Sequence, residues 1–150
     1  MDRNAAKASV QTDDDLGAGP LHRILVADSD AEHFATVRDT LQTEGTTLRL
    51  VSSSEELTVR MATERPDVVI LDPGFAEGRA LAIYREHCRE PRPGLVVCTA
   101  DRSAEMRLAC AEAGADHLVY KPVLAEELPL LIDNLLYRLN GEQQADQWVL

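Results

Sequence analysis

The chain has 150 residues, 45% of them hydrophobic and 27% charged, which is enough for one domain with a substantial core. Its apolar runs are too short to cross a bilayer and its start lacks the apolar core of a signal peptide, so a cytoplasmic protein is the default expectation. The net charge of −11 argues against a nucleic-acid-binding face and suits a basic protein partner or a metal cation.

In chain order, residues 1–20 are small and polar, with an acidic cluster, and we expect them to form a disordered N-terminal tail. A first strand is predicted over residues 24–27. Asp30 or Ser29 can cap the helix that follows, and a glycine ends that helix. A strand of alternating character over residues 47–51 comes next.

Residues 53–66 are predicted to form a helix, because a Ser-x-x-Glu capping box opens the segment and a proline closes it. The apolar run 68–71 then indicates a strand covered on both faces. This strand ends at Asp72, and a Pro-Gly pair turns the chain immediately afterwards.

A short loop over residues 73–78 precedes the third predicted helix, and a second buried strand covers residues 95–99. Asp101 or Ser103 can cap the fourth helix. A last strand is predicted over residues 117–120. The three cysteines match neither a disulfide framework nor a zinc spacing, and we interpret them as reduced, small packing residues: Cys88, Cys98 and Cys110.

The final helix carries a leucine stripe, with Pro129 near its start, so it either begins late or bends in its first turn. We expect a polar C-terminal tail over residues 140–150, where Trp148 belongs to a short apolar end. Five strands alternating with five helices predict a parallel sheet with helices on both faces.

Four polar residues lie at or just past the ends of different predicted strands: Asp28, Asp72, Thr99 and Lys121. These ends meet at one edge of a parallel sheet, where α/β proteins bind ligands. Two carboxylates about 4 Å apart repel by about 4 kcal/mol, which favours a bound cation such as Mg²⁺. With a lysine and a hydroxyl nearby, the chemistry indicated is phosphoryl transfer to a carboxylate.

Over about residues 22–139 the sequence resembles the receiver domain of bacterial two-component response regulators. The matching segments, in order, are Ile24-Leu25-Val26-Ala27-Asp28, Pro66-Asp67-Val68-Val69-Ile70-Leu71-Asp72, Val96-Val97-Cys98-Thr99-Ala100 and Gly114-Ala115-Asp116 followed by Lys121-Pro122. The resemblance implies a flavodoxin-like (βα)5 three-layer sandwich with strand order 2-1-3-4-5, over residues 21–139.

The resemblance also implies roles for individual residues. Asp72 corresponds to the phosphorylated aspartate, and Asp28 to the first acid of a metal-binding pair. The backbone carbonyl of Gly74 corresponds to a Mg²⁺ ligand. Thr99 corresponds to the hydroxyl that follows the phosphoryl group, and Lys121 to the lysine that pairs with it, before a peptide bond to proline that is usually cis.

The sequence departs from the family pattern at three places. The second acid of the metal-binding pair is Ser29, and Asp30 is either a displaced ligand or a helix cap. The loop after the aspartate is two residues shorter than usual, with Gly78 six positions on. The switch aromatic of the last strand is replaced by Leu118, while Tyr120 is aromatic two positions later on the same face.

Two functions follow from the resemblance. In the first, the chain is a single-domain receiver that a histidine kinase or phosphotransfer protein phosphorylates and that acts on a downstream protein. In the second, it is a pseudo-receiver that binds proteins without phosphorylation. Neither is a conventional enzyme: at most the domain takes a phosphoryl group from a donor and removes it again. Nucleic acid and membrane insertion are not expected, and a second copy of the chain is another candidate partner.

Overall fold

The computed structural model describes residues 22–42, 45–124 and 126–148. The strands in these ranges form one five-stranded parallel sheet in the order β2-β1-β3-β4-β5, which confirms the predicted fold class and strand order. The strands are β1 (His22–Ala27), β2 (Thr46–Val51), β3 (Val68–Leu71), β4 (Gly94–Thr99) and β5 (His117–Tyr120). The tail predicted over residues 1–20 lies outside the described residues.

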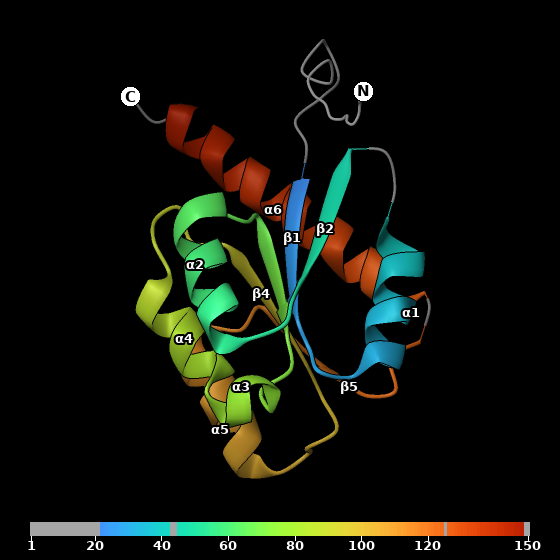
Figure 1. The fold of residues 1–150 in the computed structure, drawn as a ribbon. Coiled ribbons are helices and arrows are strands. Elements are labelled where there is room, and N and C mark those ends of the chain that lie inside the picture. The colour runs from blue at the N-terminus through green and yellow to red at the C-terminus, as the bar shows by residue number, and fades with distance from the viewer. Residues whose placement is uncertain (1–21, 43–44, 125, 149–150) are drawn as a thin grey trace, which may run out of the picture.

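Helices cover both faces of the sheet (Figure 1). One face carries α1 (Ala31–Leu41) and α6 (Glu127–Trp148), and the other carries α2 (Ser54–Glu64), α4 (Ala80–His87) and α5 (Ala104–Ala113). None of the helices in the described ranges is long and apolar enough to cross a membrane.

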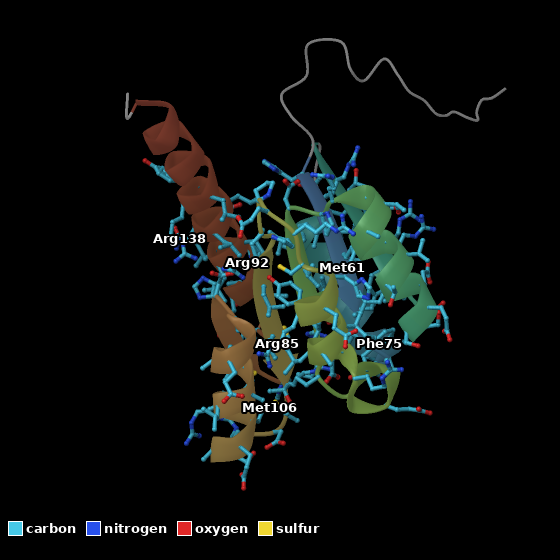
Figure 2. The ribbon with its side chains drawn as sticks, turned by 90° about the vertical axis from the view of Figure 1, so that its left-hand side faces the viewer. Met61, Phe75, Arg85, Arg92, Met106 and Arg138 are labelled. Atoms are coloured by element: carbon cyan, nitrogen blue, oxygen red, sulfur yellow. The ribbon has the colours of Figure 1, made fainter. Side chains whose placement is uncertain are left out.

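Side chains of each strand alternate between two hydrophobic cores, as the pleat of a strand requires. In β1, Ile24 and Val26 pack toward α1 and α6, whereas Leu25 and Ala27 pack toward α2 and α4. All residues of β3 and β4 are buried because these strands lie inside the sheet. The core on the second face includes Met61 and Phe75, both labelled in Figure 2.

The helix caps decide between the alternatives that the sequence leaves open. Asp30 caps α1, with its side chain accepting from two backbone amides, and Ser103 caps α5. In α2 the Ser53 side chain accepts from the amide of Glu56, as predicted. The Glu56 carboxylate accepts from the amide of Ser52 over 2.8 Å. In a standard capping box it would accept from the amide of the cap residue, which here is Ser53.

The segment after Asp72 is more compact than the predicted loop. It contains a single helical turn, α3 (Phe75–Gly78), in which Ala76 and Glu77 both have φ of 58°. This left-handed conformation is uncommon for residues with a Cβ atom. The structure adopts it where a short connection must reverse the chain between β3 and α4.

The last helix, α6, is longer than the sequence predicts. It begins at Glu127, and Pro129 is its third residue, where a backbone N–H has no partner within the helix. It then continues past Asn140 and Gly141 to Trp148, so the predicted tail starts inside the helix and not after it. One interior glycine costs about 1 kcal/mol, and the Glu, Gln and Ala residues that follow favour helix. In both views α6 projects beyond the sheet (Figures 1 and 2).

Candidate functional site

The carboxyl ends of β1, β3 and β5 bring three charged residues together, as the sequence predicts. Asp28 directly follows β1, Asp72 follows β3 and Lys121 follows β5. Backbone hydrogen bonds extend the sheet to two of them: the amide of Asp72 donates to Ala27, and that of Lys121 donates to Thr99, each over 2.9 Å. The backbone positions of these side chains are therefore fixed by strand pairing.

The ammonium group of Lys121 bridges the two carboxylates. Its Nζ atom lies 2.9 Å from Oδ2 of Asp72 and 2.9 Å from Oδ2 of Asp28. Burial by itself would lower the pKa of Lys121, but hydrogen bonds and charge from the two aspartates raise it above its ordinary value. Lys121 therefore remains a cation between two anions. The peptide bond from Lys121 to Pro122 is cis, as the resemblance implies.

Asp28 is the most enclosed member of the site, with 2% of its side chain exposed. Its Oδ1 atom accepts from the amide of Asp30 (2.9 Å) and from Lys121 (3.1 Å), and its Oδ2 atom contacts Lys121 and Nδ1 of His33 (2.6 Å). Burial would raise the pKa of this carboxyl, but the hydrogen bonds from His33, Lys121 and the Asp30 amide hold it below the ordinary value.

His33 is the site residue that the sequence analysis missed. It lies on α1, and the structure buries it against Asp28. A carboxylate only accepts hydrogen bonds, so the proton must lie on Nδ1, and Nε2 has no hydrogen-bond partner among the described residues. The only available signal was its position, three residues past the helix cap and five past Asp28.

Asp72 is more open than Asp28. Its side chain is 21% exposed, its Oδ1 atom accepts from the amide of Gly74 (2.9 Å), and its Oδ2 atom accepts from Lys121. A carboxylate has about four acceptor positions, so these two contacts leave about two free. The short turn after Asp72 therefore does not seal the carboxylate from solvent.

Thr99 ends β4 next to this group and is 4% exposed. Its hydroxyl oxygen accepts from the amide of Asp101 over 3.0 Å, and within the described residues it makes no hydrogen bond to Asp72 or Lys121. Tyr120 pairs with Thr99 across the β4–β5 ladder, and the guanidinium of Arg102 lies 4.3 Å from the centre of its ring. This cation–π contact joins β5 to the loop that follows Thr99.

The three cysteines do not contribute to the site. All three are free, and Cys98 and Cys110 are buried in the two cores. Burial raises the pKa of the Cys98 thiol to about 12, so this residue is inert at neutral pH.

A cavity of about 350 Å³ lies at the opposite edge of the sheet, where the strands begin. His22, Asp67 and Pro93 line it from three strand starts, and Leu136 and Leu139 line it from α6. It therefore belongs to a different end of the molecule from Asp72. Nearby, Arg92 and Arg138 both contact Asp116, at 3.3 and 3.6 Å, and their side chains lie close together in Figure 2.

A doubly wound parallel sheet with an Asp-Asp-Lys group beyond its carboxyl edge defines a flavodoxin-like α/β domain with a polar site at the usual ligand-binding position. Comparison with known proteins narrows this class. Residues 24–133 match the sequence model of the response regulator receiver domain. The chain belongs to this family, whose members act in two-component signalling.

Among curated relatives, response regulator MprA of Mycobacterium avium is 32% identical over 129 residues, covering 83% of this chain and 55% of MprA. The TorCAD operon transcriptional regulatory protein TorR of Escherichia coli is 26% identical over 124 residues, covering 83% of this chain and 54% of TorR. The chain thus spans about half the length of these relatives. A CheY-like receiver domain protein from Methanospirillum hungatei has the same fold, with a TM-score of 0.74 at 22% identity, covering 81% of this chain and 98% of that one.

Receiver domains generally bind Mg²⁺ at the phosphorylation site. The residues present here fit such an ion poorly. The carboxylate of Asp30 caps α1, and the carbonyl of Gly74 accepts from the amide of Gly78 (3.3 Å) within the α3 turn. Both oxygens of Asp28 already contact protein groups, namely the amide of Asp30, His33 and Lys121. In the described part of the chain, no group of three or more His, Cys, Asp or Glu side chains is arranged to hold a metal ion.

Proposed function

We propose that the chain is a receiver that accepts a phosphoryl group on Asp72 from a histidine kinase or phosphotransfer protein and acts through protein contacts. The observation that supports this most directly is the state of the Asp72 carboxylate. It is partly exposed, it keeps free acceptor positions, and Lys121 lies 2.9 Å from it.

In the transfer, an oxygen of Asp72 attacks the phosphorus atom and forms an acyl phosphate, while the bond from phosphorus to the donor breaks. With acetyl phosphate the leaving group is acetate, which departs with the electron pair. With a phosphohistidine the departing imidazole takes a proton from solvent. Lys121 pairs with the phosphoryl oxygens, and the amide of Gly74 holds the other carboxylate oxygen in place.

The response to phosphorylation is proposed to pass through Thr99 to the surface of α5 and β5. The Thr99 hydroxyl is held by the amide of Asp101, and the Arg102–Tyr120 contact lies next to it. A movement of Thr99 toward a phosphoryl group would release the Asp101 amide. Because Leu118 is not aromatic, the coupling cannot use a rotating ring at that position, and Tyr120 is the aromatic residue available.

One observation favours the second candidate function, a pseudo-receiver that binds partners without phosphorylation. Ser29 stands in place of the second acid, and Asp28 already has protein partners on both oxygens. A domain with this arrangement could retain the surface of a receiver and lose its phosphoryl chemistry.

The wider setting is also part of the proposal. The receiver unit would cover residues 21–139 in a cytoplasmic protein, with residues 1–20 as an N-terminal tail and with α6 continuing past residue 139 to Trp148. Its partners would be a kinase or phosphotransfer protein and a downstream protein, with a second copy of the chain as a further candidate. The net charge of −11 supports protein partners over direct contact with nucleic acid.

The test is incubation of the full chain with acetyl phosphate, followed by intact-mass measurement. We expect a mass gain of one phosphoryl group that Asp72→Asn abolishes. Asp67→Asn is the matched control, because Asp67 precedes the same strand at its other end and Asn keeps an oxygen for the amide of Arg23. Absence of a mass gain in the wild-type chain under all conditions would favour the pseudo-receiver.

A further inference from the structure

The acceptor positions of Asp28 are all in use. Its two oxygens make four contacts with three donor groups, namely the amide of Asp30, Nδ1 of His33 and Nζ of Lys121. A carboxylate offers about four such positions. An ion that approached Asp28 would have to displace a protein donor from a side chain that is 2% exposed.

These contacts form a closed ring at the start of α1. The amide of Asp30 donates to Asp28, and the Asp30 side chain accepts from the amide of His33 (3.2 Å). Nδ1 of the His33 imidazole then donates to Asp28, which completes the circle of hydrogen bonds. The His33 side chain is 6% exposed, so packing holds it in this orientation. These hydrogen bonds occupy the acceptor positions of Asp28 and hold Oδ1 of Asp30 as the cap of α1.

The charge of the site is also nearly balanced without an ion. With the second acid present, three carboxylates and one lysine would sum to −2, which a divalent cation neutralises. With Ser29 in that place, Asp28, Asp72 and Lys121 sum to −1. Mg²⁺ loses its bound water reluctantly, so a smaller negative charge and fewer free oxygens both weaken its binding.

We propose that His33 and Lys121 close Asp28 to divalent cations, so that Lys121 and not Mg²⁺ is the cation of this site. His33 is then a positioning residue that acts through Asp28. The closure of Asp28 to cations does not depend on the proposed function. Its consequence does: if Asp72 is phosphorylated, the transfer proceeds without a bound metal.

The experiment is a Mg²⁺ titration of the ¹⁵N-labelled full chain, followed by the amide signals of Asp30 and Gly74. For the wild type we expect weak, non-saturating shifts. His33→Leu removes the donor and should raise the Mg²⁺ affinity about tenfold, because the ion no longer has to displace a hydrogen bond to a charged carboxylate. His33→Asn is the matched control, because its amide can replace Nδ1–H, and it should behave as the wild type does.

Saturation of the wild type at low millimolar Mg²⁺ would overturn the inference, as would equal affinities of His33→Leu and His33→Asn. If His33→Leu does not fold, Lys121→Gln replaces it: the inference then requires tighter Mg²⁺ binding in that variant, and unchanged binding overturns it. Acetyl phosphate labelling with EDTA in place of Mg²⁺ is run in parallel. Labelling that EDTA abolishes contradicts the inference, whereas no labelling in either buffer contradicts the proposed function and leaves the titration to decide the inference.

Discussion

Nζ of Lys121 lies 2.9 Å from Oδ2 of Asp72, although 49 residues separate the two in the chain. The same ammonium reaches Asp28, 93 residues away. No local pattern places these side chains together; the parallel sheet does so, by ending β1, β3 and β5 at one edge. Stability and site geometry therefore depend on the same three-residue group.

Replacement of Lys121 by methionine is expected to destabilise the protein by about 3 kcal/mol, because it leaves the buried Asp28 charge without its cation. Urea denaturation at neutral pH measures the change. Lys121→Arg keeps the charge and should lose less. A Lys121→Met variant as stable as the wild type would show that the bridge contributes nothing to folding.

Acid should destabilise the protein through Asp28. Hydrogen bonds from His33, Lys121 and the Asp30 amide hold the pKa of this carboxyl below its ordinary value of 3.8 in the folded state. A lowered folded-state pKa gives stability that is present above the unfolded value and is lost as the pH falls through the folded value. We expect the free energy of unfolding to decrease as the pH falls below 3.8.

Asp28→Asn is the control for this pH dependence, since it cannot titrate there. Its stability should vary less over the same acid range, measured by urea denaturation at each pH. If both proteins show the same slope, other carboxyl groups account for the acid sensitivity.

The sequence predicts the parts of this structure that depend on local patterns. The buried run 68–71 and the glycines and prolines around the strands locate the sheet, and the strand ends identify Asp28, Asp72 and Lys121 as neighbours. These predictions hold because hydrophobic period and turn residues determine where a strand ends, and a parallel sheet determines which ends meet.

What could not be predicted depends on three-dimensional contacts. No ligand spacing marks His33 in the sequence, and its contact with Asp28 forms only when α1 packs beside the end of β1. The positive φ of Ala76 and Glu77 comes from the short path between β3 and α4. The passage of α6 through Gly141 shows that a single glycine does not end a long helix.

Ser29→Asp should increase Mg²⁺ affinity. Ser29 is exposed and lies outside the ring of hydrogen bonds at the start of α1, so a carboxylate there would be free to bind an ion. One added charge about 4 Å from a divalent cation contributes about 2 kcal/mol even in water, or roughly 30-fold in affinity. Calorimetric titration measures it, with Ser29→Asn as the uncharged control. Equal affinities of the two variants would mean that position 29 does not face the site.

Gly94→Ala tests how α6 is seated on the sheet. A Cβ atom at Gly94 would lie 2.5 Å from Cδ2 and 2.9 Å from Cγ of Leu135, which is fully buried, so that side chain or its helix must shift. Such overpacking costs about 1–3 kcal/mol, so the midpoint of urea unfolding should fall. Gly74→Ala is the matched control, because its nearest neighbour is Oδ1 of Asp72 at 3.5 Å, an ordinary contact, and its φ of −75° suits alanine. Equal stability of the two variants would mean that α6 can shift away from β4 at little cost.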